Sequence, residues 1–243
     1  YVHSIHELND TTLWVSTVGE GIVKIILNKN GITPTVKSAT RIILDGGRLA
    51  SNYFFTSFQE NDSILWFGNR GYGAHRLNLE TGKFTPYKFD NIVNSQMTND
   101  IFAIYKNENG YWFATSSGLL HFNQEDSQHH NKVELLSKNT AHGILEDQQN
   151  NIWISTNQGL VRFNPKTHTS QTYDRKNGLE VTEFSDGAFY KDIPTETLFF
   201  GGTNGFVAIK PNDYNMATYM PQISMKRLSI FGKEYNIHDF LYE

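Results

Sequence analysis

The residues with the clearest capacity for chemistry are the histidines, which can ligate metals or transfer protons. The 9 histidines include no H-E-x-x-H spacing of the kind that binds zinc on a helix. His129 and His130 lie in a polar run, 124–132, that predicts a solvated loop. His3 and His6 are three positions apart on a predicted strand, which is expected to place them on opposite faces. We therefore expect no metal site and no cofactor.

Acidic residues occur close together at two places, Glu60 with Asp62 and Glu146 with Asp147. Two carboxylates can act as a general acid and base, but both places lie at strand ends, where hydrogen bonding within a turn explains them more simply. The sequence contains no G-x-S-x-G elbow and no cysteine, which excludes disulfides, thiolate metal sites and a cysteine nucleophile. We expect no catalytic residues.

Arginine beside aromatic residues suggests a different chemistry, which is ligand binding. Sugars favour aromatic platforms flanked by polar donors, and arginine pairs with carboxylate or sulfate groups. Six residues near the second glycine turn and the strand before it combine these properties: Arg70, Tyr72, His75, Arg48, Tyr53 and Phe54. The alternative is that Tyr72 and Phe54 are packing residues and that Arg70 is a solvated turn residue.

Composition narrows the class of protein further. The formal net charge is -4 and no basic run occurs, so nucleic acid is not an expected partner. Aromatic residues make up 14% of the chain, and glycine is far more frequent than proline. This mixture is typical of many short strands joined by tight turns.

The elements that must position the candidate residues come from a repeat. The phrase Leu-Trp-Val-Ser-Thr and its variants recur five times, at intervals of about 40 to 50 residues, the period of propeller blades. All 4 tryptophans occupy the same place in the phrase, and a phenylalanine takes that place in the fifth copy: Trp14, Trp66, Trp112, Trp153 and Phe199.

Each copy predicts four short strands. Alternating segments precede the aromatic strand at 2–8, 52–59, 101–106, 142–146 and 187–191, and a glycine turn and a third strand follow it. Polar outer strands are expected at 83–88 and 169–173. We predict an all-β propeller with blades at 1–45, 46–96, 97–138, 139–180 and 181–213, in which the tryptophans pack between blades. A β-solenoid is the alternative, but its repeats are shorter.

The segment Asp147 to Asn164 resembles the two-component-regulator propeller repeat, which runs roughly D-x-x-G-x-I-W-I-G-T-x-x-G-L-x-x-F. The copy at 110–122 matches nearly as well, and Phe199 marks the copy that departs most. The repeats cover about residues 1–213. Residues 220–233 resemble the opening strands of the immunoglobulin-like domain that follows these propellers, so 214–243 is expected to begin that domain or to link to it.

The resemblance implies a sensor. Members of this family are hybrid two-component regulators of Bacteroidetes, whose periplasmic half detects oligosaccharides and whose kinase, receiver and DNA-binding parts control genes for polysaccharide use. It implies that this segment is non-catalytic and periplasmic, within an inner-membrane protein that has histidine kinase activity and forms a homodimer. It also implies more blades than five. The alternatives are a propeller-type lyase or hydrolase acting on carbohydrate, and a protein-interaction scaffold.

Overall fold

The computed structural model describes residues 1–29, 33–44, 51–90, 95–123, 132–135, 139–181, 183–213, 228–230 and 233–235. The chain divides into two compact units, Tyr1–Pro211 and Asn212–Glu243. Nothing in the described part of the chain forms a helix that is both long enough and apolar enough to cross a membrane.

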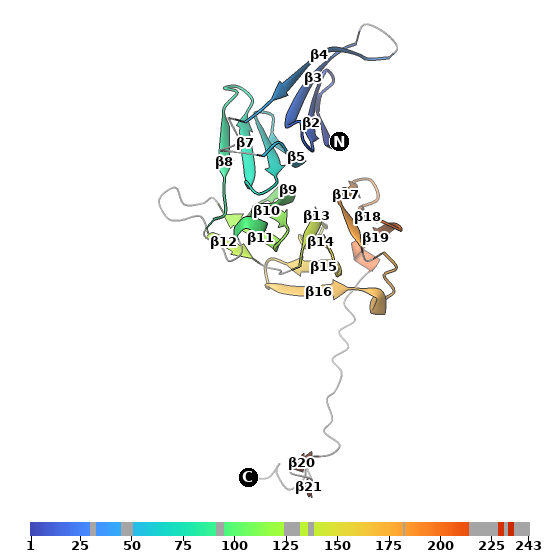
Figure 1. Ribbon diagram of the computed structural model, residues 1–243. Helices are drawn as coiled ribbons and strands as arrows, with labels where there is room; N and C mark the ends of the chain where they lie inside the picture. The colour runs from blue at the N-terminus through green and yellow to red at the C-terminus, as the bar shows by residue number, and fades with distance from the viewer. Residues whose placement is uncertain are drawn as a thin grey trace. The chain divides into compact units, whose positions relative to one another are not determined.

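The first unit consists of five antiparallel sheets that follow one another along the chain (Figure 1). The first three sheets contain β1 (Val2–Asn9), β2 (Thr12–Thr17), β3 (Ile22–Asn28) and β4 (Thr35–Ile42); β5 (Phe54–Asn61), β6 (Ile64–Asn69), β7 (Ala74–Asn78) and β8 (Phe84–Tyr87); and β9 (Ile101–Asn107), β10 (Gly110–Thr115), β11 (Gly118–Asn123) and β12 (Lys132–Leu135). The last two contain β13 (Ala141–Glu146), β14 (Ile152–Thr156), β15 (Gly159–Asn164) and β16 (Thr169–Tyr173), and then β17 (Phe184–Asp192), β18 (Thr197–Gly202) and β19 (Gly205–Ile209). Short helices are α1 (Ser95–Thr98), η2 (Arg175–Asn177) and η3 (Pro211–Asp213).

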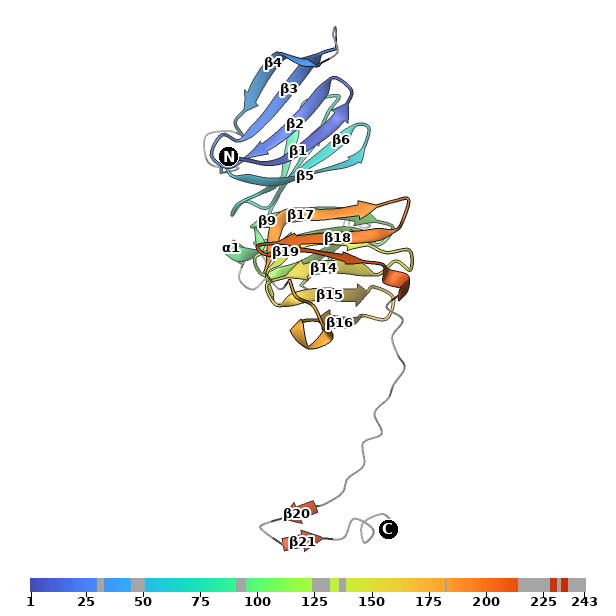
Figure 2. The same cartoon turned by 90° about the vertical axis from the view of Figure 1, so that its right-hand side faces the viewer.

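Each sheet is a blade, and its first strand is the innermost. The innermost strands contact one another in the order β1, β5, β9, β13 and β17, and β17 also contacts β5 and β9 (Figures 1 and 2). The predicted all-β propeller of four-stranded blades is therefore confirmed, with three strands described in the fifth blade. The first strand of each blade faces the centre, so the side chains of these five strands determine which chemical groups line the propeller axis.

The hairpin after each aromatic strand needs glycine for steric reasons. Gly73 has φ +75°, and a Cβ there would lie 2.1 Å from the carbonyl oxygen of Tyr87 in the outermost strand. Gly159, at the equivalent place two blades later, has φ +122°, and its Cβ would lie 2.2 Å from the carbonyl oxygen of Tyr173. Glycine alone combines this backbone conformation with so close an approach.

A threonine closes the same hairpin in three blades. The hydroxyls of Thr17, Thr115 and Thr156 donate to the carbonyl oxygens of Gly21, Gly118 and Gly159 at 2.8, 2.8 and 2.9 Å. These side chains are buried, so the hydrogen bond satisfies a polar group that would otherwise be costly to bury. This contact explains why the repeated phrase ends on threonine.

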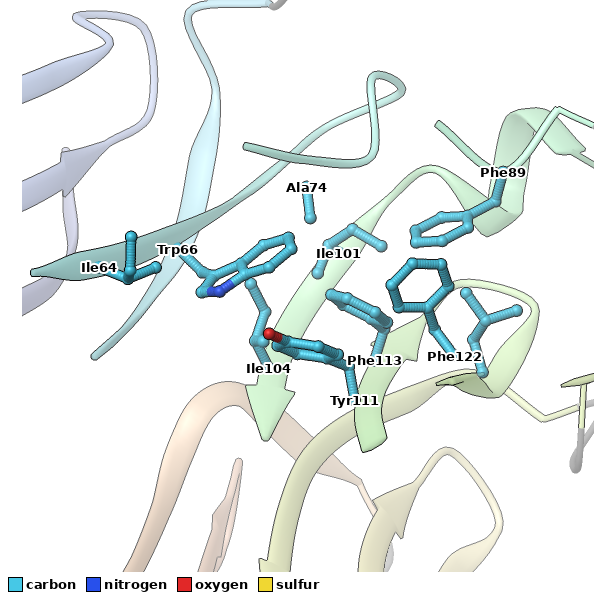
Figure 3. Packing of buried hydrophobic residues seen from close by; sticks show 10 residues of the cluster. Ile64, Trp66, Ala74, Phe89, Ile101, Ile104, Tyr111, Phe113 and Phe122 are labelled. Atoms are coloured by element: carbon cyan, nitrogen blue, oxygen red, sulfur yellow. The ribbon is translucent and has the colours of Figure 1, made fainter. Parts of the chain in front are cut away.

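The tryptophans pack between blades, as predicted. Trp66 is fully buried and lies against the third blade, with its ring centroid 4.9 Å from that of Tyr111 and 6.2 Å from that of Phe113 (Figure 3). Trp14, Trp112 and Trp153 are likewise buried in clusters shared with the blade that follows. Each sheet therefore covers one face with its own aromatic residue and the other with that of its neighbour.

In the fifth blade, no described blade packs over the aromatic position that tryptophan occupies elsewhere. Phe199 is partly exposed and contacts Tyr190 and Phe206 on its own sheet, at ring distances of 6.4 and 6.0 Å. Tyr190 is 63% exposed and Phe206 68%. The burial of an aromatic residue at this place thus depends on the next sheet rather than on its own.

The second unit is described over two short paired strands, β20 (Leu228–Ile230) and β21 (Lys233–Tyr235). The rest of 214–243 lies outside the described residues, so the immunoglobulin-like assignment stays a prediction.

Candidate functional site

The glycine turns and the first residues of the innermost strands meet at one end of the blades. In four blades, the backbone N–H of a turn residue donates to the carbonyl oxygen of the residue that opens the innermost strand. These pairs are Val18 with Tyr1 at 2.8 Å, Arg70 with Tyr53 at 3.0 Å, Asn157 with Thr140 at 3.2 Å and Thr203 with Glu183 at 3.0 Å. We call this end of the propeller the turn face. These backbone hydrogen bonds join each turn to the innermost strand of its own blade.

The structure brings two of the sequence-predicted residues together on the turn face. Arg70 is exposed, and its guanidinium carbon lies 5.7 Å from the ring centroid of Tyr53, which is 39% exposed. The planar guanidinium and the ring form a cation–π pair. This pair offers hydrogen-bond donors and an accessible aromatic surface side by side, which is the combination expected for binding a sugar.

The other four predicted residues are not part of that pair. Tyr72 is half-buried beneath a different cation, with Lys88 Nζ 4.7 Å from its ring centroid. Phe54 and His75 are each 1% exposed and pack edge-to-face at 5.8 Å, inside the core between the first two blades. Arg48 lies outside the described residues. A ligand-binding role for these six residues stays a prediction, and only Arg70, Tyr53 and Tyr72 are placed by the structure where a ligand could reach them.

Sequence reasoning missed Asn69, which organises the same loop. Its side chain is fully buried, and its Nδ2 donates to the carbonyl oxygens of Ser51 and Tyr53 at 2.9 and 3.0 Å. Its Oδ1 accepts from the backbone N–H and the hydroxyl of Ser51 at 3.1 and 3.0 Å. Three other blades have threonine at this place, so the departure from the repeat was the available signal. Asn69 thereby fixes the position of Tyr53 relative to Arg70.

The innermost strands carry a second feature at the turn face, a β-bulge repeated from blade to blade. In β1, β5, β9 and β13 one extra residue interrupts the pairing with the aromatic strand, and in β17 the interruption runs from Phe184 to Phe189. A bulge leaves its extra residue unpaired and redirects that side chain. The four extra residues and one residue of the β17 interruption are His3, Phe55, Phe102, His142 and Asp186, which we call the axial belt.

Neighbouring members of the axial belt contact one another in blade order. His3 Nδ1 lies 2.7 Å from the carbonyl oxygen of Phe55, and the Phe55 and Phe102 ring centroids are 5.1 Å apart. Phe102 stacks on His142 at 6.0 Å, and His142 Nδ1 lies 2.6 Å from Asp186 Oδ1. A Cβ built on Gly187, next to Asp186, would lie 3.8 Å from the His3 ring, so this part of β17 lies near the first blade.

The expectation that His3 and His6 lie on opposite faces of their strand is wrong. Both reach β5, His3 through the contact just described and His6 through its Nε2, 3.0 Å from Gln59 Oε1. The bulge at His3 adds a residue and breaks the strict alternation on which the expectation rested. Among the described residues, no three histidine, aspartate or glutamate side chains converge in a way that could hold a metal ion.

Glu60 does more than hydrogen-bond within a turn. One of its carboxylate oxygens accepts from the indole N–H of Trp66 at 2.7 Å, and the other lies 2.6 Å from Lys106 Nζ of the next blade. Burial acts to raise the pKa of Glu60, but hydrogen bonds from Lys106, Trp66 and Tyr111 outweigh it, and the net pKa is lowered below 4.5. This carboxylate stays ionised as an anchor between two blades.

Glu146, in the fourth blade, connects that blade to the third. It accepts from the hydroxyl of Tyr105 and from Nδ2 of Asn107, both at 2.6 Å and both from the preceding blade. Burial, followed by the hydrogen bond to Glu146, raises the pKa of Tyr105 above 10.0. Asp147 does act within its turn, accepting from the backbone N–H groups of Gln149 and Asn151 at 2.9 Å each, as predicted.

Comparison with known proteins agrees with this architecture. Residues 135–158 match the two component regulator propeller family. Histidine kinase P4 of Formosa agariphila is 28% identical over 231 residues, which covers 72% of this chain and 16% of that protein. Two extracellular domains assigned to hybrid two-component systems of B. thetaiotaomicron superpose with TM-scores of 0.70 and 0.68 at 22% and 16% identity.

Those two structures cover 97% and 87% of this chain, but the chain spans only 32% and 30% of their length. At such identities the likeness establishes the fold. The chain is therefore a β-propeller segment in which residues 135–158 match the two component regulator propeller repeat.

Proposed function

We propose that this chain is a non-catalytic sensing segment of a hybrid two-component signalling protein, situated outside the cytoplasm, and that the ligand it helps to detect is an oligosaccharide. The observation that carries the proposal is the match to the two component regulator propeller repeat at residues 135–158, which lies within an array of five blades. The histidine kinase, the membrane anchor and dimer formation belong to the whole protein under this proposal.

The turn face supports an oligosaccharide as the ligand. Tyr53 is 39% exposed and Arg70 is exposed beside it, while buried Asn69 holds the Tyr53 backbone in place. A rigid aromatic ring loses little conformational entropy on binding, and the adjacent guanidinium can donate to hydroxyl, carboxylate or sulfate oxygens. Propeller loops that carry such residues on a fixed frame suit ligand recognition.

The test is direct binding by the complete extracytoplasmic region. An array of neutral and acidic oligosaccharides identifies a ligand, and titration calorimetry measures its affinity. We expect Tyr53→Ala to weaken binding and Tyr190→Ala, which removes a more exposed aromatic ring from the fifth blade, to leave it unchanged. Binding to no oligosaccharide on the array would overturn the proposal. Cleavage of any of these oligosaccharides would show that the segment is an enzyme instead.

A further inference from the structure

The axial belt has a hydrogen-bonding pattern that indicates which ring nitrogen of each histidine carries a proton. A carbonyl oxygen can only accept, so His3 Nδ1 must carry the proton that it donates to Phe55. His142 Nδ1 donates in the same way to the Asp186 carboxylate. In a neutral imidazole the other nitrogen, Nε2, is then an acceptor. No hydrogen bond joins His3 Nε2, His142 Nε2 or Asp186 Oδ2 to another described residue.

These three acceptors belong to side chains that solvent can reach. The His142 side chain is 17% exposed and that of Asp186 is 28% exposed, and His3 is also partly exposed. Beside them, the Phe55, Phe102 and His142 rings follow one another at 5.1 and 6.0 Å. Phe102 is buried and Phe55 is partly exposed, so the belt combines unused acceptors with the accessible ring surface of Phe55.

The charges around the belt restrict the chemical class of ligand that would fit. Among the described residues, the hydrogen bonds and ion pairs of the belt involve no lysine or arginine. The Asp186 carboxylate would repel an anionic group. Hydroxyl groups, by contrast, can donate to a carboxylate and to Nε2, and the apolar C–H face of a sugar ring can cover an aromatic surface.

We propose that the axial belt is a binding site for a neutral sugar residue, with Asp186 and His142 accepting hydrogen bonds from its hydroxyls and Phe55 contacting its C–H face. This inference rests on the proposed function and locates the sugar within the turn face. Tyr53 lies two residues before Phe55, immediately ahead of β5, so an oligosaccharide that occupies the belt would extend toward Tyr53 and Arg70. The belt, and not Arg70, then decides whether neutral or acidic sugars are preferred.

The test uses belt variants in the complete extracytoplasmic region. Asp186→Asn keeps the size of the side chain but replaces one acceptor oxygen by a donor, and His142→Ala removes the imidazole. The matched control is His6→Ala, because His6 also bonds to a neighbouring blade but lies outside the belt. Thermal unfolding of each variant shows that the fold is intact, and Asp186→Asn alone carries the test if His142→Ala does not fold.

We expect the best neutral oligosaccharide from the array to bind at least about tenfold more weakly to both belt variants, as befits loss of a hydrogen bond to a charged group, and equally well to His6→Ala. Selective binding of sulfated or uronic-acid oligosaccharides would overturn the belt assignment. Unchanged affinity in both belt variants, with affinity lost in Tyr53→Ala, would also overturn it while the proposed function stands. Absence of all binding would refute both.

Discussion

Replacing Trp66 by alanine should be among the most destabilising single substitutions in this propeller. The side chain is fully buried, and its neighbours come from two blades (Figure 3). Truncating a buried tryptophan to alanine costs about 3 to 5 kcal/mol. The substitution also removes the N–H that donates to Glu60 at 2.7 Å, and leaving such a buried acceptor without its donor costs about 1 to 3 kcal/mol.

Substitutions at two equivalent positions in other blades separate the packing contribution from the hydrogen-bond contribution to this cost. Trp14 is 3% exposed, and its indole nitrogen is buried without a hydrogen-bond partner among the described residues. Trp14→Ala should therefore cost only the packing part, about 3 to 5 kcal/mol. Phe199 occupies the same place in the fifth blade but is partly exposed, so Phe199→Ala should cost about 1 kcal/mol, as is usual for single substitutions.

Urea unfolding followed by tryptophan and tyrosine fluorescence measures these differences, with circular dichroism as a second probe that does not depend on the deleted ring. The expected order of destabilisation is Trp66→Ala, then Trp14→Ala, then Phe199→Ala. Equal destabilisation by Trp66→Ala and Phe199→Ala would refute the reasoning, because it would mean that packing against the following blade contributes nothing to the stability of this repeat.

Three further predictions concern charge and backbone. Because the pKa of Glu60 is lowered in the folded state, its carboxylate stabilises the fold above pH 4.5, and this contribution is lost as the pH falls through the folded-state pKa. Glu60→Gln should therefore reduce the urea midpoint at neutral pH and make the decline of that midpoint in acid less steep. The raised pKa of Tyr105 contributes stability below pH 10.0 that is lost as the pH rises further. Tyr105→Phe should therefore show a shallower alkaline loss in the same assay, and an unchanged slope would argue against the burial of Tyr105 beside Glu146. Gly159→Ala should lower the thermal midpoint far more than Gly178→Ala, because Gly178, with φ +84°, has no atom within 4 Å of its would-be Cβ and incurs only the left-handed backbone cost of about 1 to 2 kcal/mol.

The blades could be predicted because their signals are local. The aromatic position, the polar turn before it and the glycine after it lie within a few consecutive residues, and hairpin geometry depends on such short segments. Asp147 illustrates the point, since its partners Gln149 and Asn151 lie two and four residues away. The packing role of the tryptophans followed as well, because a four-stranded sheet must cover its faces with its neighbours.

The roles of Glu60 and Glu146 could not be predicted in the same way. The sequence places both at strand ends, where a turn explanation is sufficient, yet Glu60 reaches Lys106 and Glu146 reaches Tyr105 across the boundary between blades. Their partners are about 40 to 50 residues away along the chain, one blade period. Only the stacking of the sheets brings these groups within hydrogen-bonding distance.

Of the six predicted ligand-binding residues, the tertiary structure separated the accessible from the buried. Nothing in the sequence distinguishes Tyr53 from Phe54, but strand alternation directs Phe54 into the core and leaves Tyr53 39% exposed beside Arg70. The sequence by itself determined the repeat, the type of blade and the aromatic residues between sheets, because each depends on short-range pattern. The tertiary structure alone decided the axial belt, because a bulge is a shift in pairing between two strands and its side chains converge only when five strands surround one axis.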